Sequence, residues 1–146
     1  MVKDDLDWKI IQLLQDNSRL SYAKIGREIN LSPSAVAERV QRLEEENVIE
    51  KYITIINPKE IGYSLSAYIT IGFNDNGYKP FLKTIDQFPE IIDCSMITGK
   101  DCLIMKVILK DNAHLQKLID RLCKFGNPTT SIVLSDVLNN ESIKIL

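Results

Sequence analysis

The chain has 146 residues and a formal net charge of −2, and 45% of its residues are hydrophobic. This length suits one domain or two small ones, and the mild acidity argues against a protein that coats nucleic acid without selectivity. No apolar run is close to the length of a membrane span, which is about 18 residues. The start MVKDDLDWK lacks the basic and apolar regions of a signal peptide. We therefore expect a cytoplasmic protein, whose three cysteines, lacking Cys-x-x-Cys spacing, are reduced thiols.

The first helix is expected between a cap at Asp4 or Asp5 and about Asp16. Its apolar side chains recur at helical spacing and are Leu6, Ile10, Leu13 and Leu14. With two further helices, this segment would complete a minimal three-helix unit.

Residues 19–49 predict two short helices around a tight turn. Ser21 can cap the first of them, and Asn30 follows it as a residue that tolerates the left-handed conformation of a turn. Ser32 and Pro33 are typical of the N-cap and first position of the next helix. This pattern is that of a helix-turn-helix, whose second helix enters the major groove of DNA.

Basic residues are concentrated in this motif. Residues 19–42 contain five basic residues against two acidic ones, a net charge of +3. The flanking residues 1–18 have two basic against four acidic, and residues 43–60 have two against five. A positive segment between acidic flanks can orient a helix on phosphate and limit non-specific binding. Taken alone, the charge pattern would favour a solvated amphipathic helix pair.

The pattern changes between residues 48 and 63. The segment VIEKYITII is β-branched and aromatic and predicts a strand, and Pro58 and Gly62 mark the end of a linker. We therefore divide the chain into a helix-turn-helix domain at residues 1–50, a strand and linker at residues 51–63 and a C-terminal domain at residues 64–146.

The C-terminal domain is expected to alternate strands and helices. Its predicted elements are a strand at 65–73, a helix at 78–87, a hairpin of strands 91–98 and 102–110, a helix from Asp111 or Asn112 to Gly126, and a strand near 130–138. This order predicts a ferredoxin-like βαββαβ sandwich, so that the whole protein is of the α+β class. Helices cover one face of such a sheet, and strand 102–110 is apolar at successive positions. We therefore expect a second subunit to cover the other face.

An ordered set of short motifs runs through both halves of the chain. It comprises Asp7, Ile10, Ile11, Leu14, Arg19, Leu31-Ser32-Pro33, Arg39-Val40, Leu43-Glu44-Glu45, Val48-Ile49, Asn57-Pro58, Leu65-Ser66-Ala67 and Gly99-x-Asp101. In this order and spacing, the chain resembles the Lrp/AsnC (feast/famine) transcriptional regulators over essentially its whole length. The resemblance implies sequence-specific binding to double-stranded DNA, homodimers that assemble to octamers, and an amino acid or similar small metabolite as effector.

A few positions depart from the residues usual in that family. Asn30 and Asn47 stand where glycine is common, and asparagine most easily replaces glycine in a left-handed conformation. Gly26 stands where the family favours alanine; both are small enough for close helix approach, although glycine weakens a helix by roughly 1 kcal/mol. Cys102 is smaller than the aromatic residue that the family often has beside the aspartate.

For DNA contact we predict the start and outer face of the third helix, together with two residues near phosphates. Serine hydroxyls and backbone N–H groups at helix starts hold phosphate, and arginine can read guanine through two hydrogen bonds. The alternative for Arg39 is a structural ion pair with an acidic neighbour such as Glu38 or Glu44. The predicted set is Ser21, Tyr22, Ser32, Ser34, Ala37, Glu38, Arg39 and Arg42.

For effector binding, the resemblance points to the turn from Gly99 to Leu103. Backbone N–H groups in a glycine turn can hold a carboxylate, and Asp101 can accept from an ammonium group. The alternative is a plain hairpin turn whose aspartate satisfies its own backbone. The predicted set is Thr98, Gly99, Lys100, Asp101, Cys102 and Leu103, with Thr130 and Ser135 as further candidates.

Two other classes of protein compete with this interpretation. One is an architectural protein that compacts DNA without an effector. The other is an enzyme built on the C-terminal half, but the chain lacks a nucleophile–base pair, a phosphate-binding loop and a set of metal ligands. The lone His114 is expected at the surface. We therefore expect no enzymatic activity, no cofactor and no metal.

Overall fold

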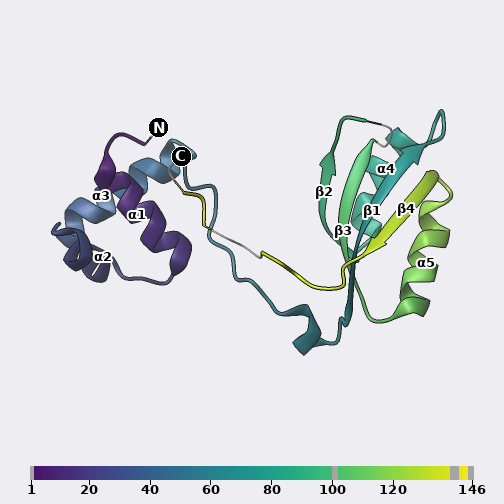
Figure 1. Cartoon of the computed structure of the whole chain (residues 1–146). Helices are drawn as coiled ribbons and strands as arrows, with labels where there is room; N and C mark the ends of the chain where they lie inside the picture. Colours follow the sequence, from purple (N-terminus) through teal and green to yellow (C-terminus); the bar gives the residue numbers. More distant parts are fainter. Residues whose placement is uncertain (1, 100–101, 139–141, 145–146) are drawn as a thin grey trace. The chain divides into compact units, whose positions relative to one another are not determined.

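The computed structural model describes residues 2–99, 102–138 and 142–144. The chain forms two compact units, one of Met1–Ile55 with Leu138–Leu146 and one of Ile56–Val137. We call them the N-terminal unit and the sheet unit (Figure 1).

The elements of the N-terminal unit are α1 (Asp5–Asp16), α2 (Tyr22–Ile29) and α3 (Pro33–Glu45). Each helix begins after a predicted cap, since the side chains of Asp4, Ser21 and Ser32 accept hydrogen bonds from backbone N–H groups of the first turn. Asn30 and Asn47 adopt the predicted left-handed conformation, with φ of 57° and 56°. The three-helix arrangement expected from the sequence is therefore confirmed.

The three helices share one core, made of Ile10, Leu14, Ile25, Ile29, Val36, Val40 and Leu43. At Gly26, α2 closely approaches the turn that follows it. A Cβ atom on Gly26 would lie 2.4 Å from the carbonyl oxygen of Leu31, and the Leu31 N–H donates to the Gly26 carbonyl at 2.9 Å. The expectation that alanine is also small enough for this close approach is therefore wrong for this backbone, because an alanine Cβ would displace the turn.

The end of the chain is bonded to α1. The side chain of Gln15 accepts from the N–H of Ile143 at 2.8 Å and donates to the Ile143 carbonyl at 3.2 Å. The hydroxyl of Ser142 donates to Asp16 at 3.2 Å. These bonds lie within the N-terminal unit, which includes Leu138–Leu146, whereas the expected C-terminal domain extends from residue 64 to residue 146.

The strand expected over residues 48–56 does not form. Residues 50–57 have no regular secondary structure, and Tyr52, Ile53, Ile55 and Ile56 are exposed. An extended segment needs a neighbouring strand for its backbone hydrogen bonds, and the described chain supplies none here. The short 3₁₀ helix η1 (Pro58–Ile61) follows and ends at Gly62, whose φ is 91°.

The sheet unit has the predicted order of elements. They are β1 (Leu65–Phe73), α4 (Tyr78–Thr84), the 3₁₀ helix η2 (Ile85–Gln87), β2 (Ile91–Met96), β3 (Leu103–Leu109), α5 (Asn112–Leu122) and β4 (Gly126–Ile132). The strands pair in the antiparallel order β2-β3-β1-β4, which confirms the ferredoxin-like fold.

The last strand begins earlier than the sequence predicts. β4 starts at Gly126, which the sequence pattern predicts as the end of the preceding helix, and Gly126 pairs with Phe73. A Cβ atom on Gly126 would lie 2.2 Å from the carbonyl oxygen of Gly72. Glycine therefore marks a close approach of two backbones at the edge of the sheet, which the sequence pattern cannot distinguish from a helix stop.

The two faces of the sheet differ. Phe81 of α4 and Leu118 of α5 pack with alternate residues of β1 and β3 in one buried core. The opposite face carries Tyr68, which is 41% exposed and lies opposite Lys106, and the half-buried Ile104. In the described part of the sheet unit the core residues of α4 and α5 pack on the other face, so the expected uncovered face is present. No helix in the described chain has the length and apolar character of a membrane span.

Candidate nucleic-acid interface and ligand region

The outer face of α3 is polar. Val36, Val40 and Leu43 are buried, and the residues on the opposite side of the helix are exposed: Ser34, Glu38, Gln41 and Glu45. The amide of Gln41 donates to Glu45 at 2.8 Å, and the hydroxyls of Ser32 and Ser34 lie 3.0 Å apart. Among the predicted DNA contacts, Ser34 and Glu38 therefore point outward, whereas Ala37 is half-buried at the edge of this face.

The two arginines of α3 lie on the flank of the helix that faces α1. The Nη1 atom of Arg39 lies 2.9 Å from an oxygen of Asp4 and 2.7 Å from one of Asp7. The Nη2 atom of Arg42 contacts both oxygens of Asp7 at 2.7 Å. The ion pair considered for Arg39 does form, but its partners are on α1 and at its cap rather than Glu38 or Glu44.

Asp7 is the centre of this cluster. Its side chain is fully buried, while those of Arg39 and Arg42 are 26% and 22% exposed. Burial raises the pKa of the Asp7 carboxyl, but hydrogen bonds from the Lys3 N–H and the two guanidinium groups outweigh burial and hold the pKa below its ordinary value. The bonds to Asp7 and Asp4 raise the pKa of Arg39. The cluster therefore joins α1 to α3 through groups that stay charged at neutral pH.

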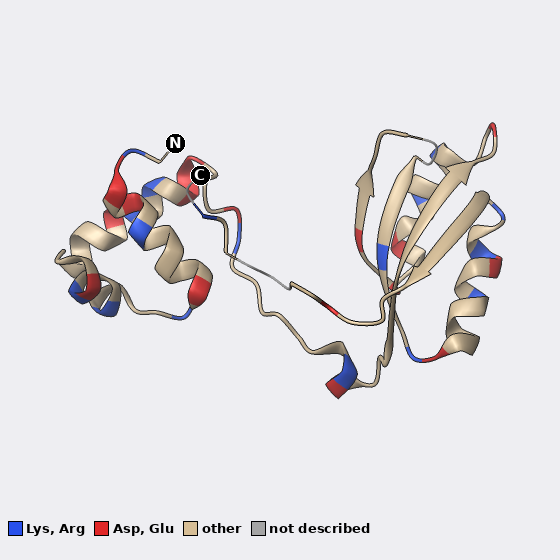
Figure 2. Cartoon of the chain, viewed as in Figure 1, with Lys and Arg blue, Asp and Glu red and all other residues tan. Residues whose placement is uncertain are grey.

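The positive segment predicted from the sequence is smaller on the surface. Arg39 and Arg42 are compensated by Asp4 and Asp7, so they add little free positive charge. On α2, Lys24 and Arg27 are exposed, and neither forms an ion pair within the described chain; Figure 2 shows basic residues on this helix. The exposed basic residues of the motif therefore lie on α2, with Arg19 just before it.

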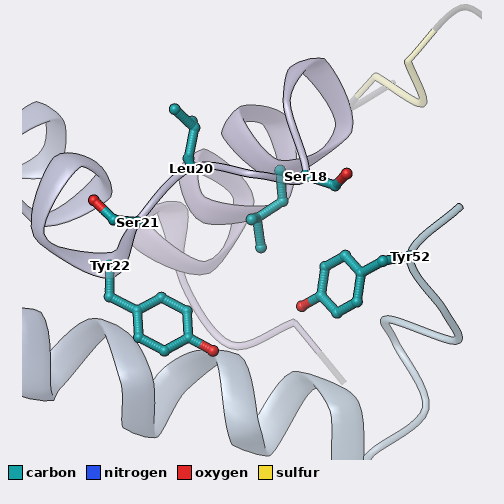
Figure 3. A pocket seen from close by; sticks show the side chains of 6 residues that line it. Ser18, Leu20, Ser21, Tyr22 and Tyr52 are labelled. Atoms are coloured by element: carbon teal, nitrogen blue, oxygen red, sulfur yellow. The ribbon is translucent and has the colours of Figure 1, made fainter. Parts of the chain in front are cut away.

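A pocket of about 430 Å³ lies at the start of α2 and is lined by Leu14, Ser18, Leu20, Ser21, Tyr22 and Tyr52. Figure 3 shows the rings of Tyr22 and Tyr52 on either side of it, with their hydroxyls turned toward each other. The hydroxyl of Tyr52 donates to Glu44 at 2.8 Å, and burial together with this bond raises the pKa of Tyr52. The linker is thereby tied to the end of α3.

The predicted effector turn closes the β2–β3 hairpin. The N–H of Ile97 donates to the carbonyl of Cys102 at 3.0 Å, and the Cys102 N–H donates to the carbonyl of Ile71 at 3.1 Å. Thr98 and Gly99 are exposed, and Gly99 has φ of 130°. Leu103, the last residue of the predicted turn, is buried in the core. Lys100 and Asp101 lie outside the described residues.

The two remaining effector candidates are not part of this turn within one chain. Thr130 lies on β4 opposite Ile69 and is half-buried. Ser135 follows β4 beyond Val133, whose N–H bonds to Ser66 at the other end of β1 from Ile71. A single site containing the turn and Ser135 would therefore need residues from more than one chain.

Two family models match this chain. The AsnC-type helix-turn-helix domain matches residues 4–44, and the Lrp/AsnC ligand binding domain matches residues 66–143. The chain belongs to the Lrp/AsnC family of transcriptional regulators. It therefore has a DNA-binding helix-turn-helix domain and a ligand-binding domain, and it belongs to a family of regulators rather than of enzymes.

The similarity to known proteins extends over nearly the whole length of this chain. A helix-turn-helix-type transcriptional regulator of Pyrococcus horikoshii is 36% identical over 136 residues, which are 90% of this chain and 86% of that protein. The structure of LrpC from Bacillus subtilis has a TM-score of 0.90 at 29% identity and covers 95% of this chain and 99% of its own. A transcriptional regulator from Neisseria meningitidis, solved as an L-methionine complex, has a TM-score of 0.91 at 23% identity, with 98% and 97% covered.

The structure gives roles to three residues that the sequence pattern alone does not predict: Asp7, Gln41 and His114. In the sequence, Asp7 stands out only as one of the residues shared with the family, yet its carboxylate bonds to both arginines of α3. The sign in the sequence is an aspartate inside the apolar pattern of the first helix. Gln41 lies on the outer face of α3 and was not among the predicted contacts. His114 is 26% exposed rather than a free surface residue, and its Nε2 lies 3.2 Å from the buried Glu90, which also accepts from Arg121 at 2.9 Å.

Proposed function

We propose that this regulator binds specific operator sequences and that an amino acid or a similar small metabolite changes its affinity for DNA. The proposal is carried by the way in which α3 is held and by the side chains that it exposes. The helix is capped at Ser32, braced by Asp7 and lined on its outer face with hydrogen-bonding side chains. The exposed Lys24 and Arg27 on the preceding helix can bind phosphates beside the groove.

A two-fold dimer would present two such helices. The uncovered sheet face around Tyr68 and Ile104 supports a second copy as its cover. The two α3 helices would then meet half-sites about one helical turn, ~34 Å, or a multiple of it apart. Further assembly of dimers into an octamer would add contacts that combine through effective concentration.

An amino acid is the first class of effector to test. The likeness to the Neisseria regulator, whose structure holds L-methionine, shows only a shared fold. A ligand-binding domain matched over residues 66–143 and an exposed glycine turn at Thr98 and Gly99 support a small ligand. Isothermal titration of the purified protein with each of the twenty amino acids would test this part.

The DNA-binding part is tested by gel shift with duplexes selected from random sequence. The double variant Lys24→Ala with Arg27→Ala should lose affinity at least tenfold and show a weaker salt dependence, since two phosphate contacts are removed. The matched control removes two basic residues from the sheet unit, Lys117→Ala with Lys124→Ala, and should keep its affinity. No selection of any sequence, together with a broad footprint and no heat from any amino acid, would instead indicate an architectural DNA-compacting protein.

A further inference from the structure

The guanidinium groups of the two α3 arginines are bonded to carboxylates of the protein itself. Arg42 contacts both oxygens of Asp7, and Arg39 contacts Asp4 and Asp7, at distances of 2.7 to 2.9 Å. A guanidinium group that turned toward DNA would leave the fully buried Asp7 carboxylate without that partner. A buried charge without a partner strongly destabilises the folded protein, so we expect these contacts to persist when the protein binds DNA.

The outward positions are filled by other side chains. Ser34, Glu38 and Gln41 are exposed and follow each other at intervals of four and three residues, which places them on one face of the helix. A helix rises 1.5 Å per residue, so Glu38 and Gln41 are offset by roughly 4.5 Å along the axis. Base pairs are stacked about 3.4 Å apart, and the two side chains would therefore meet bases one or two steps apart.

The chemistry of these two side chains is not that of an arginine. A glutamate only accepts hydrogen bonds, and in the major groove it suits the N4 amino group of cytosine. It is repelled by the carbonyl oxygens that guanine and thymine present, so it also discriminates against those bases. The amide of Gln41 can bind the N6 and N7 atoms of adenine, and its bond to Glu45 at 2.8 Å fixes the orientation of the side chain.

We propose that Glu38 and Gln41 determine the DNA sequence that this protein recognises, by reading a cytosine and an adenine one or two base pairs apart. Arg39 and Arg42 are positioning residues that fix α3 against α1. This inference rests on the proposed DNA-binding function and assigns the base-reading role within it.

The test is selection of binding sites from a randomised duplex by the full-length protein, followed by affinity measurements on single-base variants of the preferred site. Glu38→Ala should reduce the preference for cytosine at one position at least tenfold, with other positions unchanged. Gln41→Ala should do the same to an adenine at a neighbouring position. Arg39→Lys and Arg42→Lys should weaken binding to all sequences by similar factors and leave the base preferences intact.

Glu28→Ala is the matched control, because it removes an exposed carboxylate from α2 and should leave every preference unchanged. Melting curves of all variants show whether the fold is kept. Intact preferences in Glu38→Ala and Gln41→Ala, or a guanine preference lost with either arginine, would overturn the inference while leaving the regulator function standing. A wild-type protein that selects no sequence would overturn both.

Discussion

At the scale of single residues, the turn of the N-terminal unit depends on which side chains can occupy it. Asn30 and Asn47 adopt left-handed conformations that other non-glycine residues rarely accept. Gly26 has a different role, because it makes room for the backbone of Leu31. The first two positions could be predicted, since a left-handed turn selects its residue type locally. The contact at Gly26 depends on where the chain goes after the turn, and the sequence alone does not contain that distance.

Gly26→Ala is expected to lower the stability of the protein. Alanine is the better helix former by about 1 kcal/mol, but its Cβ would lie 2.4 Å from a backbone oxygen that cannot rotate away. Overpacking of this kind costs roughly 1–3 kcal/mol, so the melting temperature measured by circular dichroism should fall by several degrees. Ala23→Gly, at an exposed position of the same helix, measures the difference in helix propensity between alanine and glycine without any overpacking. A melting temperature higher in Gly26→Ala than in wild type would show that the backbone of the turn at Leu31 moves to accept the Cβ atom at little cost, contrary to this prediction.

At the scale of elements, α3 is fixed by the Ser32 cap at its start and by an ionic cluster along its side, and α2 has a cap of the same kind at Ser21. The caps at Ser21 and Ser32 could be predicted because each acts on residues two or three positions away. The cluster could not, since Asp7 lies 32 residues before Arg39 and their meeting depends on how α1 packs on α3. The strand expected at residues 48–56 is absent for a similar reason. The residue types favour extended structure, but a strand also needs a neighbouring strand for its backbone hydrogen bonds, and the described chain supplies none here.

Asp7→Asn is expected to weaken this joint and to change its response to acid. Removing the charge leaves two partly buried guanidinium groups underpaired, so unfolding free energy at pH 7 should fall by about 3 kcal/mol. Because the pKa of Asp7 is lower in the folded chain, its stabilising effect is present above the unfolded value near 3.9 and is lost as the pH falls through the folded value. Wild type should therefore lose more stability than the variant between about pH 5 and pH 2.

Urea unfolding at several pH values measures this effect, and Asp5→Asn is the control, since Asp5 is an exposed acid of the same helix. Parallel pH profiles of Asp7→Asn and wild type would contradict the assignment of the acid response to this carboxylate.

At the scale of the whole molecule, the sheet unit exposes one face that a single chain does not cover. Tyr68, Ile104 and Ile108 lie on that face, whereas the helices cover the other. The alternation of β1 predicted this division, because side chains along a strand point to opposite faces in turn. The effector set could not be predicted in the same way, because the turn beside Ile71 and Ser135 beyond Val133 lie toward opposite ends of β1, and only the paired strands show this separation.

Ile104→Glu is expected to convert the protein into smaller species. A carboxylate on this face would lose its hydration if a second sheet packed on it. Light scattering should show a mass near the 16.6 kDa of one chain in the variant and at least twice that in wild type. Gln116→Glu, on the exposed side of α5, should keep the wild-type mass. An unchanged mass in Ile104→Glu would place the subunit contact elsewhere.

The pairing of Gln15 with Ile143 has a practical consequence for anyone who labels this protein. The polypeptide passes from one unit to the other after Ile55 and returns after Val137. A fluorescent dye attached beside Ile143 would therefore move with the helix-turn-helix, although its attachment point follows the sheet unit in the sequence. Its emission would report on the N-terminal unit, and a dye on α5 would report on the sheet unit.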